Sequence, residues 1–163
     1  MTDLTSLIER IEAGDGADRA LECDVARAFG WHRVEPRFTR SRRGGWIAPE
    51  DFMGVDRDGR PILSESGTPM WPDPPRVTTD LNAVIALCER VLPGWQVVLS
   101  TGDADRVRDE ERLPSATLIP HLLNDAGWAL GSKARSPSYA KTPARALLAA
   151  LLRAKEGQSH DPR

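Results

Sequence analysis

Residues 142–155 read TPARALLAALLRAK, and this stretch defines a helix at both of its ends. Thr142 suits the N-cap, and Pro143 suits the first helical position, where its missing N–H costs nothing. Arg153 and Lys155 complement the negative end of the helix dipole. Leucines at helical spacing form one stripe, beside alanines that permit close approach to a flat partner such as a sheet: Leu147, Leu148, Leu151 and Leu152. The stretch therefore predicts a closing helix that packs on a sheet.

Two short helices are predicted at the start of the chain, where apolar residues recur at helical spacing. The first follows an N-cap at Thr2 or Asp3 and ends at Gly14. The second starts at Asp18 and stops at Gly30. Since only a few residues separate them, we expect these helices to form a hairpin.

A third helix and a sheet are predicted after residue 77. Asp80, with the two threonines before it, caps an apolar helix that Pro93 ends. Strands are expected at residues 95–101, 115–120 and 127–135, which are separated by turn signals. These short strands and turns predict an antiparallel sheet.

The segment between the second and third helices is rich in proline and glycine and keeps neither periodicity for long. Within it, residues 52–55 and 61–63 flank the turn residues 56–59, which predicts a small hairpin. The proline-rich run 68–75 is expected to be extended, because each proline pushes the residue before it out of the helical region. We treat residues 33–76 as an irregular insertion.

The length of 163 residues fits one domain, which we assign to residues 1–156, with a flexible tail at 157–163. The net charge of −2 predicts no general attraction to nucleic acid or to an anionic membrane. The first twelve residues carry acidic groups and no apolar signal region, and no apolar run is long enough to span a bilayer. We therefore expect an unprocessed cytoplasmic protein with no membrane partner.

No metal site, cofactor or catalytic residue is predicted. No two of the three histidines have the spacing of a helix-borne metal site, and no phosphate-binding glycine motif occurs. His121 and Asp125 could meet on a helical turn, but no nucleophile stands in a recognisable motif nearby. Cys23 and Cys88 fall on apolar helix faces, where we expect free thiols. The histidines are His32, His121 and His160.

Several blocks of sequence carry a family resemblance through their order and spacing. They are residues 7–14 (LIERIEAG), 18–19, 26–31 (ARAFGW), 77–84 (VTTDLNAV), 92–95 (LPGW), 128–130 (WAL) and 141–147 (KTPARAL). Together they resemble the phage ABA sandwich domain family, small proteins found in phage and prophage genomes. The resemblance implies layers of helix, sheet and helix, a phage or prophage origin, and no catalytic residues. It does not extend to residues 33–76.

One segment has the composition of a ligand site, with five arginines in the eleven residues 33–43, interleaved with Phe38. Guanidinium groups suit phosphate oxygens, and aromatic rings can stack on a base, so a nucleotide or single-stranded nucleic acid could bind here. The alternative is that these arginines pair with carboxylates, such as Asp51 and the acidic turn 103–111. The arginines are Arg33, Arg37, Arg40, Arg42 and Arg43.

Two of the five tryptophans, Trp46 and Trp71, lie in the same insertion. They could anchor a partner, or they could simply pack on the sheet. The candidate binding residues are therefore Arg37, Arg40, Arg42, Arg43, Trp46 and Trp71.

These observations predict an α-β-α sandwich: a small antiparallel sheet packed by the N-terminal helix pair, the central helix and the C-terminal helix. The leading functional hypothesis is a non-enzymatic accessory binding protein of a phage or prophage, which acts on a host protein or a nucleotide. A structural or self-assembling phage component is a second hypothesis. An enzyme that acts on nucleotides or nucleic acid is the third and least favoured.

Overall fold

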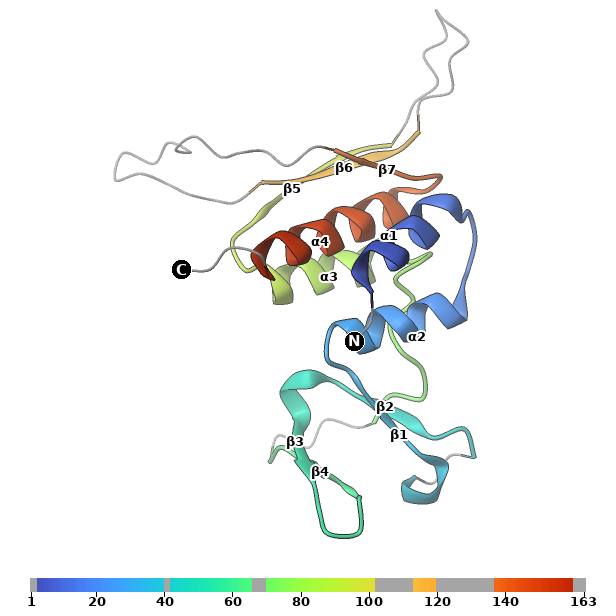
Figure 1. Ribbon diagram of the computed structural model, residues 1–163, viewed down its shortest axis with the longest axis vertical. Helices are drawn as coiled ribbons and strands as arrows, with labels where there is room; N and C mark the ends of the chain where they lie inside the picture. Colours follow the sequence, from blue (N-terminus) through green and yellow to red (C-terminus); the bar gives the residue numbers. More distant parts are fainter. Residues whose placement is uncertain (1–2, 40–41, 66–69, 102–112, 120–136, 160–163) are drawn as a thin grey trace, which may run out of the picture. The chain divides into compact units, whose positions relative to one another are not determined.

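The computed structural model describes residues 3–39, 42–65, 70–101, 113–119 and 137–159 (Figure 1). Helices and small antiparallel sheets alternate along the chain, which confirms a mixed α+β fold. The chain divides into two compact units. Unit 1 contains residues 22–75 and the first two residues, and unit 2 contains residues 3–21 and 76–163. The single-domain assignment stays a prediction, and each unit is described separately below.

Three helices of unit 2 begin at capping residues that the sequence indicates. The Asp3 carboxylate accepts the Thr5 N–H at 3.1 Å, and the Asp80 carboxylate accepts the N–H groups of Asn82 and Ala83. The Thr142 hydroxyl accepts the Arg145 N–H at 3.3 Å. Each cap satisfies a backbone donor that would otherwise have no partner. The helices are α1 (Leu4–Ala13), α3 (Leu81–Val91) and α4 (Pro143–Ser159).

The remaining helix, α2 (Arg19–Ala28), contains the boundary between the two units. At its start the Asp18 carboxylate accepts the Leu21 N–H at 2.8 Å. Beyond its end, Gly30 has a positive φ of 81°, a conformation that favours glycine. The predicted start and stop of this helix are thus confirmed.

The sheet of unit 2 has three antiparallel strands in the order β5-β6-β7. The pairing of β5 with β6 places Val98 opposite Thr117. The first two predicted strands and their antiparallel pairing are confirmed, whereas the strand expected at 127–135 lies outside the described residues. The strands are β5 (Gln96–Ser100), β6 (Ser115–Ile119) and β7 (Ser138–Tyr139).

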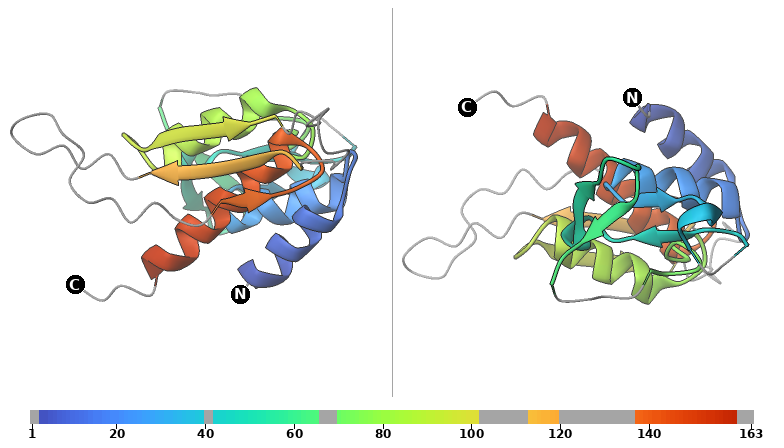
Figure 2. Two further views of the ribbon diagram at one scale, coloured as in Figure 1. Left: turned by 90° about the horizontal axis from the view of Figure 1, so that it is seen from above. Right: turned by 90° about the horizontal axis from the view of Figure 1, so that it is seen from below.

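Helix α4 lies at the centre of unit 2. It packs against the sheet, and α1 and α3 pack against it on the same side of that sheet (Figures 1 and 2). Every residue from Ala144 to Leu152 is buried, so the expectation of a single apolar stripe is wrong. A helix that is apolar on all sides belongs in an interior, and neighbours on several sides provide one here. The helix also continues to Ser159, three residues into the predicted tail.

Unit 1 begins with a two-stranded sheet in which β1 (His32–Val34) pairs with β2 (Gly45–Ile47). The backbones of Trp46 and Trp71 add a further bridge: each N–H donates to the other's carbonyl oxygen, at 2.8 and 2.9 Å. The sequence did not predict these strands, because three-residue strands show no periodicity. Two 3₁₀ helices flank β2 along the chain: η1 (Pro36–Phe38) lies in the β1–β2 connection, and η2 (Pro49–Asp51) follows β2.

The second sheet of unit 1 is the predicted hairpin, formed by β3 (Phe52–Val55) and β4 (Pro61–Leu63). The Asp56 carboxylate closes its turn by accepting the N–H groups of Asp58 and Arg60, at 2.9 and 2.8 Å. The β-structure of the described residues is therefore distributed over three small sheets, not gathered in one. None of the described helices is long and apolar enough to cross a membrane.

Candidate ligand pocket

Unit 1 contains a cavity of about 130 Å³ lined by the two hairpins and by η1. Its lining combines cationic, aromatic and acidic side chains in a small volume. The residues that give it this character are His32, Arg33, Glu35, Arg37, Phe38 and Phe52.

Arg37 and Phe38 are neighbours in η1, and their side chains are in contact. The guanidinium carbon of Arg37 lies 4.5 Å from the centroid of the Phe38 ring, a cation–π geometry. The Arg37 Nε also forms an ion pair with Glu35 Oε2 at 2.7 Å. Because the Arg37 and Glu35 side chains are 66% and 62% exposed, water can reach both members of this pair.

Arg33 is held more firmly than Arg37. Its Nη2 donates to the Arg43 carbonyl oxygen at 3.0 Å, across the β1–β2 connection. Its guanidinium carbon lies 5.4 Å from the centroid of the Trp46 ring, and that of Arg27 lies 5.6 Å from the same centroid. The hydrogen bond and the ring contact fix the direction of the Arg33 side chain.

His32 and Phe52 form a third part of the lining. Their rings stack with centroids 3.4 Å apart and planes 19° from parallel. His32 comes from β1 and Phe52 from β3, so this stack joins the two hairpins. Both residues of the stack line the cavity.

The structure distributes the predicted binding residues unevenly. Arg37 lines the pocket, and Arg42 and Arg43 are exposed in the turn that precedes β2. Arg40 lies outside the described residues. The two tryptophans differ: Trp71 is 49% exposed, whereas Trp46 is only 1% exposed.

The interpretation of Trp46 as a partner anchor therefore needs correction. Its backbone is paired on one side with β1 and on the other with Trp71, which places the ring in the interior of unit 1. Two guanidinium groups lie over the ring. Trp46 does not line the pocket, and its buried ring is not presented to a ligand.

The alternative, that the arginines pair with carboxylates of the chain, is realised for Arg37. Its partner is Glu35, two residues before it, while the buried Asp51 accepts the Ser64 hydroxyl at 3.1 Å. The acidic turn 103–111 lies outside the described residues. Sequence reasoning did not single out Glu35 or Phe52, although the run Glu-Pro-Arg-Phe at 35–38 does bring an acid, a base and a ring together.

No metal site is found in the described part of the chain, and the buried one of its two cysteines has a strongly raised pKa. Its residues include no group of three or more His, Cys, Asp or Glu that could hold an ion. Cys23 and Cys88 are free. Burial, with a smaller contribution from the charge of Glu89, raises the pKa of Cys88 to about 12, so this thiol stays protonated at neutral pH.

No family model, no curated protein and no solved structure matches this chain. The resemblance to the phage ABA sandwich domain family, with the origin it implies, stays a prediction.

Proposed function

We propose that this protein is a non-enzymatic binding protein and that the pocket of unit 1 holds a small nucleotide. The observation that carries the proposal is a cavity of about 130 Å³ whose lining residues include two arginines, a histidine and two phenylalanines. Guanidinium forks match phosphate oxygens, and every base has a face that can stack on an aromatic ring.

The size of the cavity limits what it can enclose. Pockets that enclose whole drug-sized ligands measure about 300 to 1,000 Å³. A cavity of about 130 Å³ can enclose one phosphate or one ring, and the rest of a nucleotide would lie on the exposed surface. Six arginines and a single carboxylate in residues 27–43 make this region positive in spite of the chain's net charge of −2. Local charge therefore favours an anion.

The lining favours binding over catalysis. Of the described residues, those that line the pocket include no Ser, Thr or Cys that could act as a nucleophile. The one histidine in it, His32, is stacked on Phe52. Sequestration of a host nucleotide by a phage or prophage protein would need binding alone, and an enzyme acting on nucleotides remains the least favoured proposal.

The test is calorimetric titration of the full chain with the 5′-monophosphates of the four common nucleosides. We expect at least one to bind, and we expect Arg37→Gln to weaken that binding about tenfold, because a charge-assisted hydrogen bond is lost. Arg57→Gln is the matched control, since Arg57 is exposed in the β3–β4 turn and does not line the pocket. Failure of all four nucleotides to bind, or equal effects of the two variants, would contradict the proposal.

Self-association is a second candidate, favoured by apolar side chains that point into solvent. Such residues on one small hairpin can mark an interface. Light scattering would then show a mass that rises with concentration, and Met53→Ser combined with Ile62→Thr would reduce this rise. A monomer at all concentrations would exclude the candidate. The exposed apolar residues of this hairpin and their exposed fractions are Met53 67%, Val55 60%, Ile62 46% and Leu63 37%.

A further inference from the structure

We infer that the base of the nucleotide, and not its phosphate, occupies the cavity, and that the Glu35 carboxylate makes the cavity selective for guanine. The inference rests on the proposed nucleotide binding and names the base that the same pocket accepts. Glu35 and Arg37, which form an ion pair, both line the cavity.

The carboxylate of Glu35 decides which part of a nucleotide suits the cavity. Repulsion between this group and a ligand grows with the ligand's negative charge, and a phosphate monoester carries about −1.5 to −2 at pH 7. A base is neutral at this pH, and its N–H groups can donate to a carboxylate. Six of the ten lining residues are apolar or glycine, and two of these, Phe38 and Phe52, are aromatic. The lining therefore suits a flat ring that donates hydrogen bonds.

Local backbone structure holds Glu35 and Arg37 together. Glu35 is extended, with φ −67° and ψ 151°, and Pro36 then begins the 3₁₀ turn. The Phe38 N–H donates to the Glu35 carbonyl oxygen at 3.0 Å, and the Thr39 N–H donates to the Pro36 carbonyl oxygen at 3.1 Å. Because the proline ring also fixes its own φ, the turn keeps the carboxylate and the guanidinium within reach of each other.

The ion pair places an acceptor group beside a donor group. The 2.7 Å contact joins Arg37 Nε to Glu35 Oε2, and among the described residues the Glu35 side chain has no other polar partner. A carboxylate has about four lone-pair sites, so both of its oxygens can still accept from a ligand. The ring of Phe38, 4.5 Å from the guanidinium carbon of Arg37, supports the donor group from one side.

Guanine presents the complementary pattern along one edge. Its O6 is an acceptor, and the neighbouring N1–H and amino N–H groups are donors. The two oxygens of Glu35 can accept both of these donors, while the Arg37 guanidinium donates to O6. Adenine, cytosine and uracil each have a single donor group on this edge, so one of their acceptors would face a carboxylate oxygen. Guanine therefore forms the most hydrogen bonds with the pair.

The phosphate then lies outside the cavity, where arginines other than Arg37 can bind it. Arg33 uses one of its five N–H groups on the Arg43 carbonyl oxygen, and among the described residues the others have no acceptor. Arg42 and Arg43 are exposed in the turn before β2. The positive charge of this segment and the carboxylate of Glu35 thus act on different parts of the nucleotide.

The experiment is calorimetric titration of the full chain with five 5′-monophosphates, those of guanosine, adenosine, cytidine, uridine and inosine. The base of inosine is guanine without the amino group. We expect wild type to bind the guanosine nucleotide about tenfold more tightly than each of the others, because only guanine donates twice to Glu35. Glu35→Gln should weaken the binding of the guanosine nucleotide about tenfold, since an amide has one acceptor oxygen, and should change the others by about threefold or less.

Glu65→Gln is the control, since Glu65 is an exposed acid of the same unit that does not line the pocket, and it should leave all five affinities unchanged. If another nucleotide, inosine included, binds wild type as tightly as the guanosine nucleotide, the selectivity is refuted while the proposed function stands. The role of Glu35 is refuted if Glu35→Gln keeps the full preference or weakens all five nucleotides equally. If no nucleotide binds wild type, the proposed function itself fails.

Discussion

Replacing Arg145 by methionine is expected to lower the free energy of unfolding by about 3 kcal/mol, a large share of the stability of a domain of this size. Arg145 is only 2% exposed, although it stands in the first turns of α4. Its guanidinium group is a donor to backbone carbonyl oxygens far away in the sequence, and these oxygens determine the effect of the substitution.

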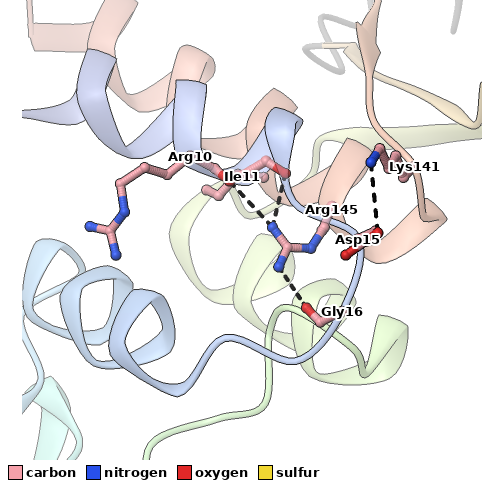
Figure 3. A network of polar contacts seen from close by, with 6 residues as sticks. All are labelled: Arg10, Ile11, Asp15, Gly16, Lys141 and Arg145. Atoms are coloured by element: carbon pink, nitrogen blue, oxygen red, sulfur yellow. Dashed lines mark hydrogen bonds and ion pairs between the residues drawn. The ribbon is translucent and has the colours of Figure 1, made fainter.

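Figure 3 shows the arrangement. The Nη1 of Arg145 donates to the carbonyl oxygens of Ile11 at 3.0 Å and Arg10 at 3.4 Å, in the last turn of α1, and Nη2 donates to that of Gly16 at 2.6 Å. The last carbonyl groups of a helix have no partner within the helix and carry its negative partial charge. Gly14 leaves room for this arrangement, because a Cβ at residue 14 would overlap the Arg145 guanidinium group.

A buried ion pair can often be replaced by apolar side chains with no loss of stability, because both charges are then removed. Such a replacement of both partners is impossible for Arg145, because its acceptors are backbone carbonyl groups, which no substitution removes. Each carbonyl left buried without a donor costs about 1–3 kcal/mol. Arg145→Lys should retain part of the stability, because an ammonium group is a point donor without the planar fork.

Urea unfolding followed by circular dichroism measures the effect. Arg153→Met is the control on the same helix. Arg153 donates to both carboxylate oxygens of Glu12 and to the Ser138 hydroxyl, but its side chain is 39% exposed, so we expect a loss of about 1–2 kcal/mol, smaller than for Arg145→Met. Equal losses for the two variants, or a loss below about 1 kcal/mol for Arg145→Met, would show that the buried hydrogen bonds do not stabilise the fold as argued.

The helices could be predicted because their signals are local. Asp80 and Thr142 each cap a helix within three residues of the donors that they satisfy, and Gly30 has the positive φ that its position requires. The burial of α4 on all sides could not be predicted from local signals. It depends on α1 and α3, which pack on the helix from other parts of the chain.

The site residues were predicted less well for the same reason. The arginine-rich segment supplies Arg33 and Arg37 to the lining of the cavity, and its role in binding stays a prediction. The proline- and glycine-rich insertion made Trp46 a candidate anchor for a partner, whereas its backbone pairs with both β1 and Trp71 and its ring is buried. The stack of His32 on Phe52 likewise requires two hairpins to meet. Contacts between such distant segments cannot be predicted from periodicity in the sequence.

Gly44→Ala is expected to lower the free energy of unfolding of unit 1 by about 3 kcal/mol and to abolish nucleotide binding there. Gly44 has a φ of +78°, and a Cβ at this position would overlap the carbonyl oxygen of Val34. The positive φ alone destabilises a residue other than glycine by about 1–2 kcal/mol. The overlap adds to this, because the obstacle is the backbone of β1 and not the end of a flexible side chain.

Gly59→Ala separates the effect of the positive φ from that of the overlap with the Val34 carbonyl oxygen. Gly59 has nearly the same φ, +77°, but the nearest atom to a Cβ there is the Phe38 Cζ at 4.0 Å, so only the backbone strain of about 1 kcal/mol is expected. Tryptophan fluorescence during urea unfolding measures the loss, and its signal includes that of Trp46, whose ring is buried in unit 1, among the five tryptophans. If both variants lose the same stability, Val34 and Gly44 do not approach as closely as described. A larger loss for Gly44→Ala means that β1 cannot move away, and β1 supplies both His32 and Arg33 to the pocket.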